Sequence, residues 1–491
     1  MRKTIGLLLA AAALPAPAAA SITFTGNLAI AGEATDLSGY GPEFGANRLS
    51  FGSDLIYDAA TNLYYGITDR GPGGGLVDFA PRVHAFSLSF DPVTHAPTGF
   101  TLQSTTIFRD ETGSVFSGFN PTLLNGNVST LGRSFDPEGL ARLPNGNFLV
   151  SDEYGPSVYE FKPDGSLVRR FEVPANLVPK QPDGTVNYVD GRPTITEGRQ
   201  DNRGYEGITV SNDGTKAHAI MQDPLVNEGA QNDGRRSRNV RIVEYDLATG
   251  KPARQFVYQL EALSDINDRI DGTANDFSAT NQGRSIGASA IIAAADGSFL
   301  VIERDNRGRG VEDPGGTSAI GSKRIYRITL DGATDVSGLS LAGSNALPQG
   351  VVPVGKTLFL DIQAMLKAAG LDSVEKLEGV AFGPQLANGL YSLIIASDND
   401  FSVTQTGQFG NQSDVCSSGV GGTTMQVPIG AGCPAGMTLL PTQVYAFALS
   451  GADAIGPVPE PATWAMMISG FGLVGGAMRV RRRGGRALAQ A

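Results

Sequence analysis

The sequence predicts an all-β protein and, within that class, a β-propeller. The chain has 491 residues, of which 64 are Gly and 28 are Pro, and this share favours tight turns and short strands over a helical bundle. Short apolar or alternating segments recur between Gly, Asn, Asp and Pro. Repeated hairpin units of this kind are typical of propeller blades, in which each small sheet is buried by its neighbours. We expect six blades, with seven as the alternative count and a β-sandwich assembly as the alternative fold.

Five hairpin units support this prediction. Three of their turns contain Asn145-Gly146, Asp213-Gly214 and Asp296-Gly297. Asn-Gly and Asp-Gly between alternating runs are the strongest local signal for a hairpin, because both residues adopt positive φ. Other short apolar runs, such as 158–161 and 325–329, would be outer strands of the same blades. The hairpin units cover residues 51–68, 140–151, 208–221, 290–302 and 380–397.

The charge of the chain excludes nucleic acid as a partner. Asp plus Glu number 49 against 38 Lys plus Arg, so the formal net charge is −11. Binding to phosphate backbones requires clustered Lys and Arg. An acidic chain is better suited to the capture of cations. Separately, we expect the protein to be a monomer.

The N-terminus predicts a secretory signal peptide over residues 1–20. Arg2 and Lys3 give the positive start, residues 5–14 form an apolar run, and small residues precede a cleavage site before Ser21. We therefore expect export through the Sec route.

The C-terminal tail, residues 458–491, has three parts in order. These are Pro459-Glu460-Pro461, the uncharged run Trp464–Met478, and a cluster of Arg from Arg479 onward. Basic residues after an apolar segment fit a cytoplasmic stop, although the run is shorter than the roughly 20 residues of a full membrane span. Residues 21–457 remain as the folded domain.

This tail resembles the PEP-CTERM sorting signal. The resemblance implies transient anchoring in the inner membrane by a transmembrane helix, cleavage near Pro459–Pro461 by an exosortase-type enzyme, and delivery to the cell surface or outside. A plain membrane anchor, which would keep the tail, is the alternative. The processed chain loses seven basic residues and one acidic residue with its two ends, so it is still more acidic.

Cys416 and Cys433 are the two cysteines of the chain, and both lie in the Gly-rich segment 404–438. In an oxidising compartment we expect them to form one disulfide that closes this loop. Two lone cysteines give no zinc site.

Acidic residues recur at one end of the hairpins. Three first strands open with Glu-Gly, at Glu138, Glu206 and Glu378, and the equivalent position in the remaining unit of this kind is Ser289. The turn positions predict that Glu138 faces Glu153 across its hairpin and that Ser289 faces Arg304. Like charges opposite each other destabilise a hairpin unless a positive group lies between them.

In a propeller, equivalent ends of the inner strands converge around the axis, so these acidic residues would form one rim. Many hard oxygen ligands select Ca²⁺. Arg70, Arg203 and Arg304 lie beside the carboxylates in sequence and would pair with them or with an anionic substrate. The alternative is that such residues only cap turns. The candidate calcium ligands are Asp136, Glu138, Asp152, Glu153, Glu206, Glu303, Asp305, Glu378, Asp398 and Asp400.

Several of these strings resemble the phytase-like family, often labelled "esterase-like activity of phytase". The resemblance extends over roughly residues 50–449. The matching strings are Asp136-Pro137-Glu138-Gly139, Ser151-Asp152-Glu153-Tyr154-Gly155-Pro156, Asn202-Arg203-Gly204-Tyr205-Glu206-Gly207, Glu303-Arg304-Asp305 and Leu377-Glu378-Gly379.

The resemblance implies a β-propeller and calcium-dependent hydrolysis of phosphomonoesters or related small anionic esters. Glu138 and Glu206 would then act at the reacting centre, and Arg70, Arg203 and Arg304 would stabilise charge on the transferred group. Lys is scarce near the motifs, whereas propeller phytases commonly place Lys in the phosphate pocket. This departure weakens phytate as the expected substrate.

Two other functions stay open. One is a non-catalytic, calcium-stabilised surface propeller that binds exopolysaccharide or protein in the extracellular matrix. The other is a lactonase-type propeller with His218 as general base, although an apolar strand pattern around His84 and His218 favours core positions. The chain contains no Gly-x-Ser-x-Gly string, and 71–75 lacks the Lys of a phosphate-binding loop.

Overall fold

The structure is a computed structural model that describes residues 21–457. Within this range it contains five four-stranded antiparallel sheets, one three-stranded sheet and one two-stranded sheet. Four short α-helices lie in the connections: α1 (Pro121–Asn125), α2 (Leu263–Asn267), α3 (Gln282–Ser285) and α4 (Ile362–Ala368).

Each four-stranded sheet is one blade, and its strands run in order from the inside to the outside of the molecule. The blades are β2 (Asp54–Asp58), β3 (Leu63–Ile67), β4 (Arg82–Phe90) and β5 (Pro97–Ile107); β6 (Pro137–Arg142), β7 (Phe148–Asp152), β8 (Ser157–Phe161) and β9 (Leu167–Arg170); β10 (Tyr205–Val210), β11 (Lys216–Met221), β13 (Asn239–Asp246) and β14 (Lys251–Gln259); β15 (Ile286–Ala293), β16 (Phe299–Asp305), β17 (Lys323–Thr329) and β19 (Gly355–Asp361); and β20 (Lys376–Gln385), β21 (Tyr391–Asp398), β25 (Thr442–Ser450) and β1 (Ser21–Ile30).

The innermost strands form a closed ring. Strand β2 packs against β6, β6 against β10, β10 against β15, β15 against β20, and β20 against β2 again. A closed ring of small sheets is a β-propeller, so the predicted fold is confirmed and a β-sandwich assembly is excluded.

The expected count of six or seven blades is wrong, because residues 21–457 form five. The five hairpin units found in the sequence are the inner hairpins of these five blades. The remaining length lies in long connections and in two small sheets outside the ring. These are β12 (Gly229–Ala230) with β18 (Ala342–Gly343), and β22 (Ser413–Ser417) with β23 (Thr424–Pro428) and β24 (Thr438–Leu439).

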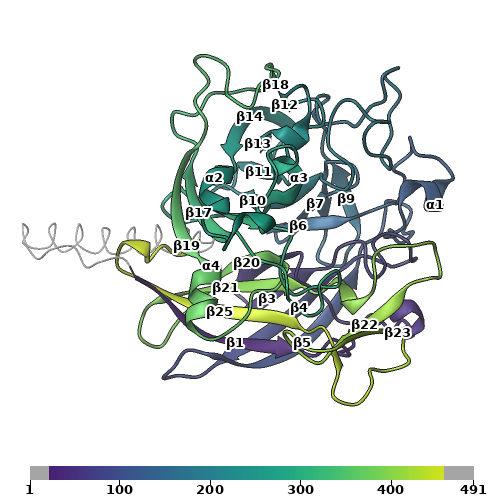
Figure 1. Cartoon of the computed structure of the whole chain (residues 1–491), viewed down its shortest axis with the longest axis vertical. Helices are drawn as coiled ribbons and strands as arrows, with labels where there is room; N and C mark the ends of the chain where they lie inside the picture. Colours follow the sequence, from purple (N-terminus) through teal and green to yellow (C-terminus); the bar gives the residue numbers. More distant parts are fainter. Residues whose placement is uncertain (1–20, 458–491) are drawn as a thin grey trace, which may run out of the picture.

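The last blade joins the two ends of the described chain. Strand β1 pairs antiparallel with β25 from Ser21↔Ser450 to Ile30↔Thr442, and Figure 1 shows the purple N-terminal strand beside the yellow C-terminal one. The outermost strand of this blade therefore comes from the opposite end of the sequence, and the ring closes only when both ends have folded.

Apolar side chains fill the spaces between blades. Between the first two blades, Phe108, Phe116, Phe135 and Phe161 are fully buried. The ring centres of Phe108 and Phe161 lie 4.4 Å apart, within the range of favourable aromatic packing.

The two ends of the inner strands differ in chemistry. The ends that lead into the hairpin turns line an open cavity of about 820 Å³, to which all five inner strands contribute apolar residues: Leu55, Leu140, Ile208, Ile292 and Val380. The other ends, where the inner strands begin, carry the acidic residues predicted from the sequence.

No helix within residues 21–457 is long and apolar enough to cross a membrane. The predicted signal peptide (1–20) and the predicted transmembrane helix of the tail (464–478) lie outside the described residues.

Gly207→Ala should destabilise the propeller. A Cβ at Gly207 would lie 2.7 Å from the backbone nitrogen of Ile291 and 2.9 Å from Cα of Ala290, in the inner strand of the next blade. We expect a loss of about 1–3 kcal/mol in the free energy of unfolding, measured with urea. Gly338→Ala is the control, because a Cβ at Gly338 meets nothing within 4 Å. Equal stability of the two variants would contradict this packing.

Candidate metal centre

Four of the five inner strands carry a β-bulge at the same position. The pairing register skips one residue in each strand: Glu138 in β6, Glu206 in β10, Ser289 in β15 and Glu378 in β20. A bulge takes a residue out of the ladder and redirects its side chain. All four side chains are buried. The repeated Glu-Gly of the sequence is therefore a bulged glutamate followed by a glycine that packs closely.

The register of the first of these hairpins differs from the predicted one. Gly139 lies opposite Ser151, and Glu138 has no partner across the ladder, so it does not face Glu153 as expected. The turn and the bulge together explain the difference, because the turn changes the register and the bulge then takes Glu138 out of the ladder. The hairpin closes around the three-residue loop 144–146, where the sequence pattern favoured a two-residue turn, and the pairing shifts by one residue.

The bulged glutamates bring their carboxylates together. The charges of Glu206, Asp136, Glu378 and Glu153 all act on Glu138 and help to raise its pKa, after burial as the first cause. These residues come from the inner strands of three different blades, the connection before β6 and the turn after β7, so the centre exists only in the closed ring.

Asp69 joins the bulged glutamates to a second group of carboxylates. One oxygen each from Asp69, Asp136 and Glu138 lie within 4.8 Å of one another, and the same holds for Asp69, Asp398 and Asp400. All five residues are buried. We call the whole set the acidic centre: Asp69, Asp136, Glu138, Glu153, Glu206, Glu378, Asp398 and Asp400.

Three glutamate oxygens of the acidic centre have no hydrogen-bond partner among the described residues. They are Oε2 of Glu138, Glu206 and Glu378. These three residues are only 8%, 2% and 3% exposed, in that order. A buried carboxylate oxygen without a partner is costly. A cation bound between these oxygens would satisfy them, so the donor set fits a metal ion that prefers oxygen ligands.

Three arginines flank the acidic centre. Arg70 donates from its backbone N–H to Asp136 Oδ1 (2.9 Å) and from Nη1 to Oδ2 (3.0 Å). Arg203 lies with Nε 3.1 Å from Oδ2 of Asp223 and with Nη1 3.9 Å from Glu153. Both arginines thus neutralise carboxylates at the edge of the centre.

Arg304 forms an ion pair with Glu378. It lies opposite Gly287 in the hairpin and not opposite Ser289, as the sequence pattern predicted. The three-residue loop 295–297 shifts the pairing by one residue, and the bulge at Ser289 shifts it by one more. The three arginines that the sequence singled out are therefore all next to acidic residues of the predicted site.

Lys376 supplies a fourth positive charge that the sequence pattern did not predict. Its Nζ lies 3.5 Å from Asp398 and makes a closer ion pair with Asp400. The acidic centre thus has eight carboxylates and four flanking basic groups, Arg70, Arg203, Arg304 and Lys376. The excess of acidic groups must be met by protons or by a bound cation.

Burial raises the pKa of Glu153 to about 7, and the charge of Asp136 adds to this rise while Arg70 opposes it. Burial also raises the pKa of Asp400 to about 7, against the lowering effect of Lys376. For Asp69 and Glu206, burial and neighbouring carboxylates raise the pKa well above the usual range. Without a metal ion, part of the centre is therefore protonated at neutral pH.

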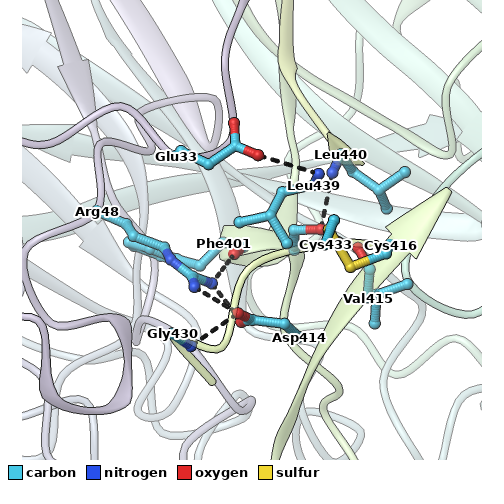
Figure 2. Close-up of a disulfide and its surroundings, with 11 residues drawn as sticks. Glu33, Arg48, Phe401, Asp414, Val415, Cys416, Gly430, Cys433, Leu439 and Leu440 are labelled. Carbon is cyan, nitrogen blue, oxygen red and sulfur yellow. Dashed lines mark hydrogen bonds and ion pairs between the residues drawn. A yellow bond between two sulfur atoms is a disulfide. The ribbon is translucent and has the colours of Figure 1, made fainter. Parts of the chain in front are cut away.

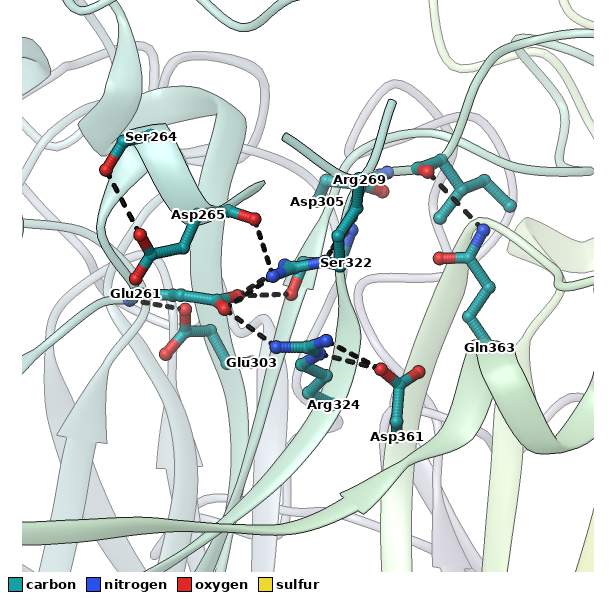
Figure 3. Close-up of polar contacts among 12 residues, drawn as sticks. Glu261, Ser264, Asp265, Arg269, Glu303, Asp305, Ser322, Arg324, Asp361 and Gln363 are labelled. Carbon is teal, nitrogen blue, oxygen red and sulfur yellow. Dashed lines mark hydrogen bonds and ion pairs between the residues drawn. The ribbon is translucent and has the colours of Figure 1, made fainter. Parts of the chain in front are cut away.

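Glu303 lies outside the acidic centre, and its prediction as a calcium ligand is corrected. Its carboxylate accepts hydrogen bonds from the Tyr258 hydroxyl (2.8 Å) and the Glu261 N–H (2.6 Å) and pairs with Lys356 (2.5 Å). Figure 3 shows it beneath Glu261, in a network of ion pairs around Arg324. These contacts satisfy its oxygens, so we remove Glu303 from the ligand set.

Asp305 is corrected in the same way. Its Oδ2 accepts the N–H groups of Gly321 (2.6 Å) and Ser322 (2.9 Å), and its Oδ1 lies 3.0 Å from Lys323. Asp305 therefore anchors the connection to β17. Along the chain, the strand end Glu303–Asp305 looked like the other acidic strand ends, but the fold places basic groups beside it.

Asp152 stabilises a turn next to the acidic centre. Its carboxylate accepts the N–H groups of Asp136 (2.9 Å), Tyr154 (3.2 Å) and Gly155 (3.1 Å). These bonds fix the turn that carries Glu153 into the centre.

Sequence reasoning missed Asp69 and Lys376 as members of the centre. A signal for Asp69 was present, because the first hairpin unit ends in Asp69-Arg70 as the others end in acidic residues. Lys376 lies two residues before Glu378, and nothing in its sequence context distinguishes it from a surface lysine.

The predicted disulfide between Cys416 and Cys433 is present, with an S–S distance of 2.04 Å. It lies in the insertion formed by residues 404–439, which contains β22, β23 and β24. Gln405 of this insertion hydrogen-bonds to Asp400, so the insertion reaches the acidic centre.

His218 is a buried strand residue. Its Nε2 lies 3.3 Å from Glu244, and its ring packs edge-on against Phe299. Glu244 also pairs with Lys216 and Arg254. His218 itself is only 3% exposed and faces Glu244 across β11 and β13, which leaves the lactonase hypothesis without its general base. His84 is likewise fully buried.

The fold and the acidic centre together define a five-bladed β-propeller with buried carboxylates at one end of its inner strands. The chain belongs to the phytase-like family, described as "Esterase-like activity of phytase", whose family model matches residues 48–401. This membership supports a hydrolase-type propeller.

A second family model, the PEP-CTERM protein-sorting motif, matches residues 457–483. The resemblance of the tail to this signal is thus confirmed, and it supports an exported, cell-surface protein.

Among curated proteins, an "Uncharacterized secreted protein" of Arthroderma benhamiae is 30% identical over 194 residues. The match covers 36% of this chain and 36% of that relative, so the chain spans about a third of the relative's length.

The solved structures that are similar to this chain include a luciferin-regenerating enzyme, which is 12% identical with a TM-score of 0.30 and covers 88% of this chain and 97% of that one. Regucalcin from Agrobacterium tumefaciens str. C58, titled a calcium-binding protein, is 12% identical with a TM-score of 0.30 and covers 77% and 86%. We draw nothing about function from likenesses of this degree.

The raised pKa values predict how the stability of the metal-free protein depends on pH. An acid with a pKa near 4 when unfolded and about 7 when folded binds its proton more tightly in the folded state, so stability falls as pH rises from about 4 to about 7. In EDTA, we expect a lower free energy of unfolding at about pH 7.5 than at about pH 5, measured with urea.

The pH difference should shrink in Asp400→Asn, because this variant has no carboxylate to ionise there. Asp164→Asn is the control, since Asp164 is an exposed turn residue. A stability that does not change with pH, or that rises over this range, would contradict the protonated centre.

Proposed function

We propose that this protein is an exported, calcium-dependent hydrolase of phosphomonoesters or related small anionic esters, with the acidic centre as its metal site. The observation that carries the proposal is the set of three buried, unpartnered glutamate oxygens within eight clustered carboxylates. Membership of the phytase-like family supports the hydrolase class.

Calcium suits this donor set because it takes six to eight oxygen ligands in flexible geometry. Asp69, Asp136 and Glu138 would hold one ion, and Asp69, Asp398 and Asp400 would hold another, with Asp69 shared. When bound, calcium supplies positive charge for the oxygens of an anionic ester and lowers the pKa of a coordinated water.

The remaining side chains of the centre can handle the proton and the substrate. Glu206 belongs to neither group of three, and its free Oε2 can accept a proton from an attacking water. Arg203 is the most exposed of the three arginines, with 22% of its side chain accessible against 12% for Arg70 and 8% for Arg304. This exposure supports Arg203 as the group that would contact an anionic substrate, while Arg70 and Arg304 would orient carboxylates.

Export completes the proposal. We propose that the chain leaves the cell through the Sec route and that an exosortase-type enzyme then removes the tail near Pro459–Pro461. The match of the sorting motif to residues 457–483 supports this route, and the fungal relative is also called secreted.

Glu138→Gln should abolish calcium-dependent turnover. The amide keeps the size of the side chain but removes the negative charge that Glu138 would contribute, together with Asp69 and Asp136, to one calcium ion. We expect kcat/KM for p-nitrophenyl phosphate in Ca²⁺ to fall by about 100-fold or more, and wild-type activity to disappear in EGTA. Glu111→Gln, an exposed residue paired with Arg170, should leave activity unchanged.

If Ca²⁺ raises the melting temperature but no phosphate ester is cleaved, the hypothesis of a phosphatase is wrong. The calcium-stabilised propeller that binds exopolysaccharide would then be favoured, and the substrate search would move to polysaccharides.

Arg203→Met should weaken substrate binding more than it weakens metal binding. Loss of a charged hydrogen-bond donor to an anionic substrate is expected to lower kcat/KM by about 10- to 100-fold, mainly through KM. Arg170→Met, on an outer strand, is the control. An unchanged KM would place the substrate away from Arg203.

A further inference from the structure

Asp400 reaches the acidic centre from a turn in an unusual backbone conformation. Asp400, Phe401 and Ser402 have φ of +48°, +55° and +55°. Left-handed backbone is unfavourable for residues other than glycine, because the Cβ approaches the following carbonyl oxygen. Three such residues in succession persist only where the surrounding structure holds them, and such strain concentrates at functional sites.

Side chains next to the turn supply part of this hold. The N–H of Asp400 donates to Asp398 Oδ1 (2.9 Å), and the N–H of Phe401 donates to Asn399 Oδ1 (3.1 Å). Asn399 in turn donates from Nδ2 to the carbonyl of Leu440 (2.8 Å). The turn is thus tied to the segment that follows the insertion.

Ser402 ties the turn to the insertion itself. Its hydroxyl donates to the carbonyl of Val415 in β22 (2.7 Å) and accepts the N–H of Leu440 (2.8 Å). A buried hydroxyl that makes both bonds fixes its own backbone firmly.

Arg48 is the second tie. Its guanidinium binds both carboxylate oxygens of Asp414, at 2.6 and 2.7 Å, and donates to the carbonyl of Phe401 at 3.1 Å (Figure 2). The pair is buried, with 10% and 1% of the two side chains exposed. A bidentate pair of this kind is geometrically specific.

The three insertion residues involved are consecutive in one strand. Asp414 forms the ion pair with Arg48, the carbonyl of Val415 accepts the hydrogen bond from Ser402, and Cys416 forms the disulfide with Cys433 (Figure 2). Strand β22 therefore connects the covalent closure of the insertion directly to the turn that carries Asp400.

We propose that the disulfide-closed insertion is a working part of the metal site: β22 holds the left-handed turn 400–402 through Ser402 and Arg48, and this hold fixes the carboxylate of Asp400 in the acidic centre. Ser402 and Arg48 are positioning residues. The identity of the ion rests on the proposed function, whereas the hold on the turn does not.

Ser402→Ala tests the hold, because it removes the hydroxyl and keeps the Cβ that makes positive φ unfavourable. We expect Tb³⁺, used as a luminescent calcium probe, to bind about tenfold more weakly, and Ca²⁺ measured by calorimetry to follow. Ser402→Gly should lose less affinity, since glycine adopts this φ without strain. Ser418→Ala, an exposed hydroxyl elsewhere in the insertion, should bind like wild type.

Hydrogen exchange gives a readout that needs no metal. In Ser402→Ala, and in wild-type protein after reduction of Cys416–Cys433, the amides of Asp400 and Phe401 should exchange at least tenfold faster, while those of β7 stay protected. Unchanged exchange at both amides would overturn the proposal whatever the metal affinity. Unchanged Tb³⁺ affinity with faster exchange would also overturn it, because the hold would not serve the site. If wild-type protein binds neither Tb³⁺ nor Ca²⁺, the proposed function is contradicted. The hydrogen-exchange result then supports or overturns the proposed hold on the turn by itself.

Discussion

Eight carboxylates share one buried space where the inner strands of the ring begin, and their mutual repulsion governs the structure around them. Two unit charges 4.8 Å apart repel by about 3–4 kcal/mol at an effective dielectric constant near 20. Four basic groups offset only part of this repulsion. The bulges that deliver Glu138, Glu206 and Glu378, and the left-handed turn that delivers Asp400, are local distortions that a simple scaffold would avoid. The bulge recurs in four blades, and its delivery of a glutamate in three of them is understandable if the centre binds a cation.

The propeller could be predicted from sequence because each inner hairpin is formed by two strands that are consecutive in the chain. Turn residues such as Asn145-Gly146 and alternating strands identify it without long-range information. The blade count could not be predicted in the same way. It depends on which segments join the ring, and residues 404–439 and the connections between blades form small sheets and loops instead. The closing strand β1 pairs with β25 across the whole chain, which no local pattern reveals.

Most of the acidic centre was also predictable, since its members lie at equivalent strand ends. The errors came from contacts between distant segments. Glu303 and Asp305 follow the same pattern as Glu153, but Lys356 and Lys323 from later strands neutralise them. Lys376 enters the centre because β20 begins beside Asp398 and Asp400. The prediction that Glu138 faces Glu153 failed because one extra loop residue changes the register of the hairpin and the bulge then takes Glu138 out of the ladder.

The most direct test is the number of protons released when Ca²⁺ binds. Calorimetric titration of chelator-treated protein near pH 6.5, in two buffers with different ionisation enthalpies, measures binding and proton release together. If the centre is partly protonated and exchanges protons for calcium, binding will be saturable and will release protons, and both effects will be lost in Glu138→Gln. No binding, or binding with no proton release, would contradict a buried carboxylate centre built to hold a cation.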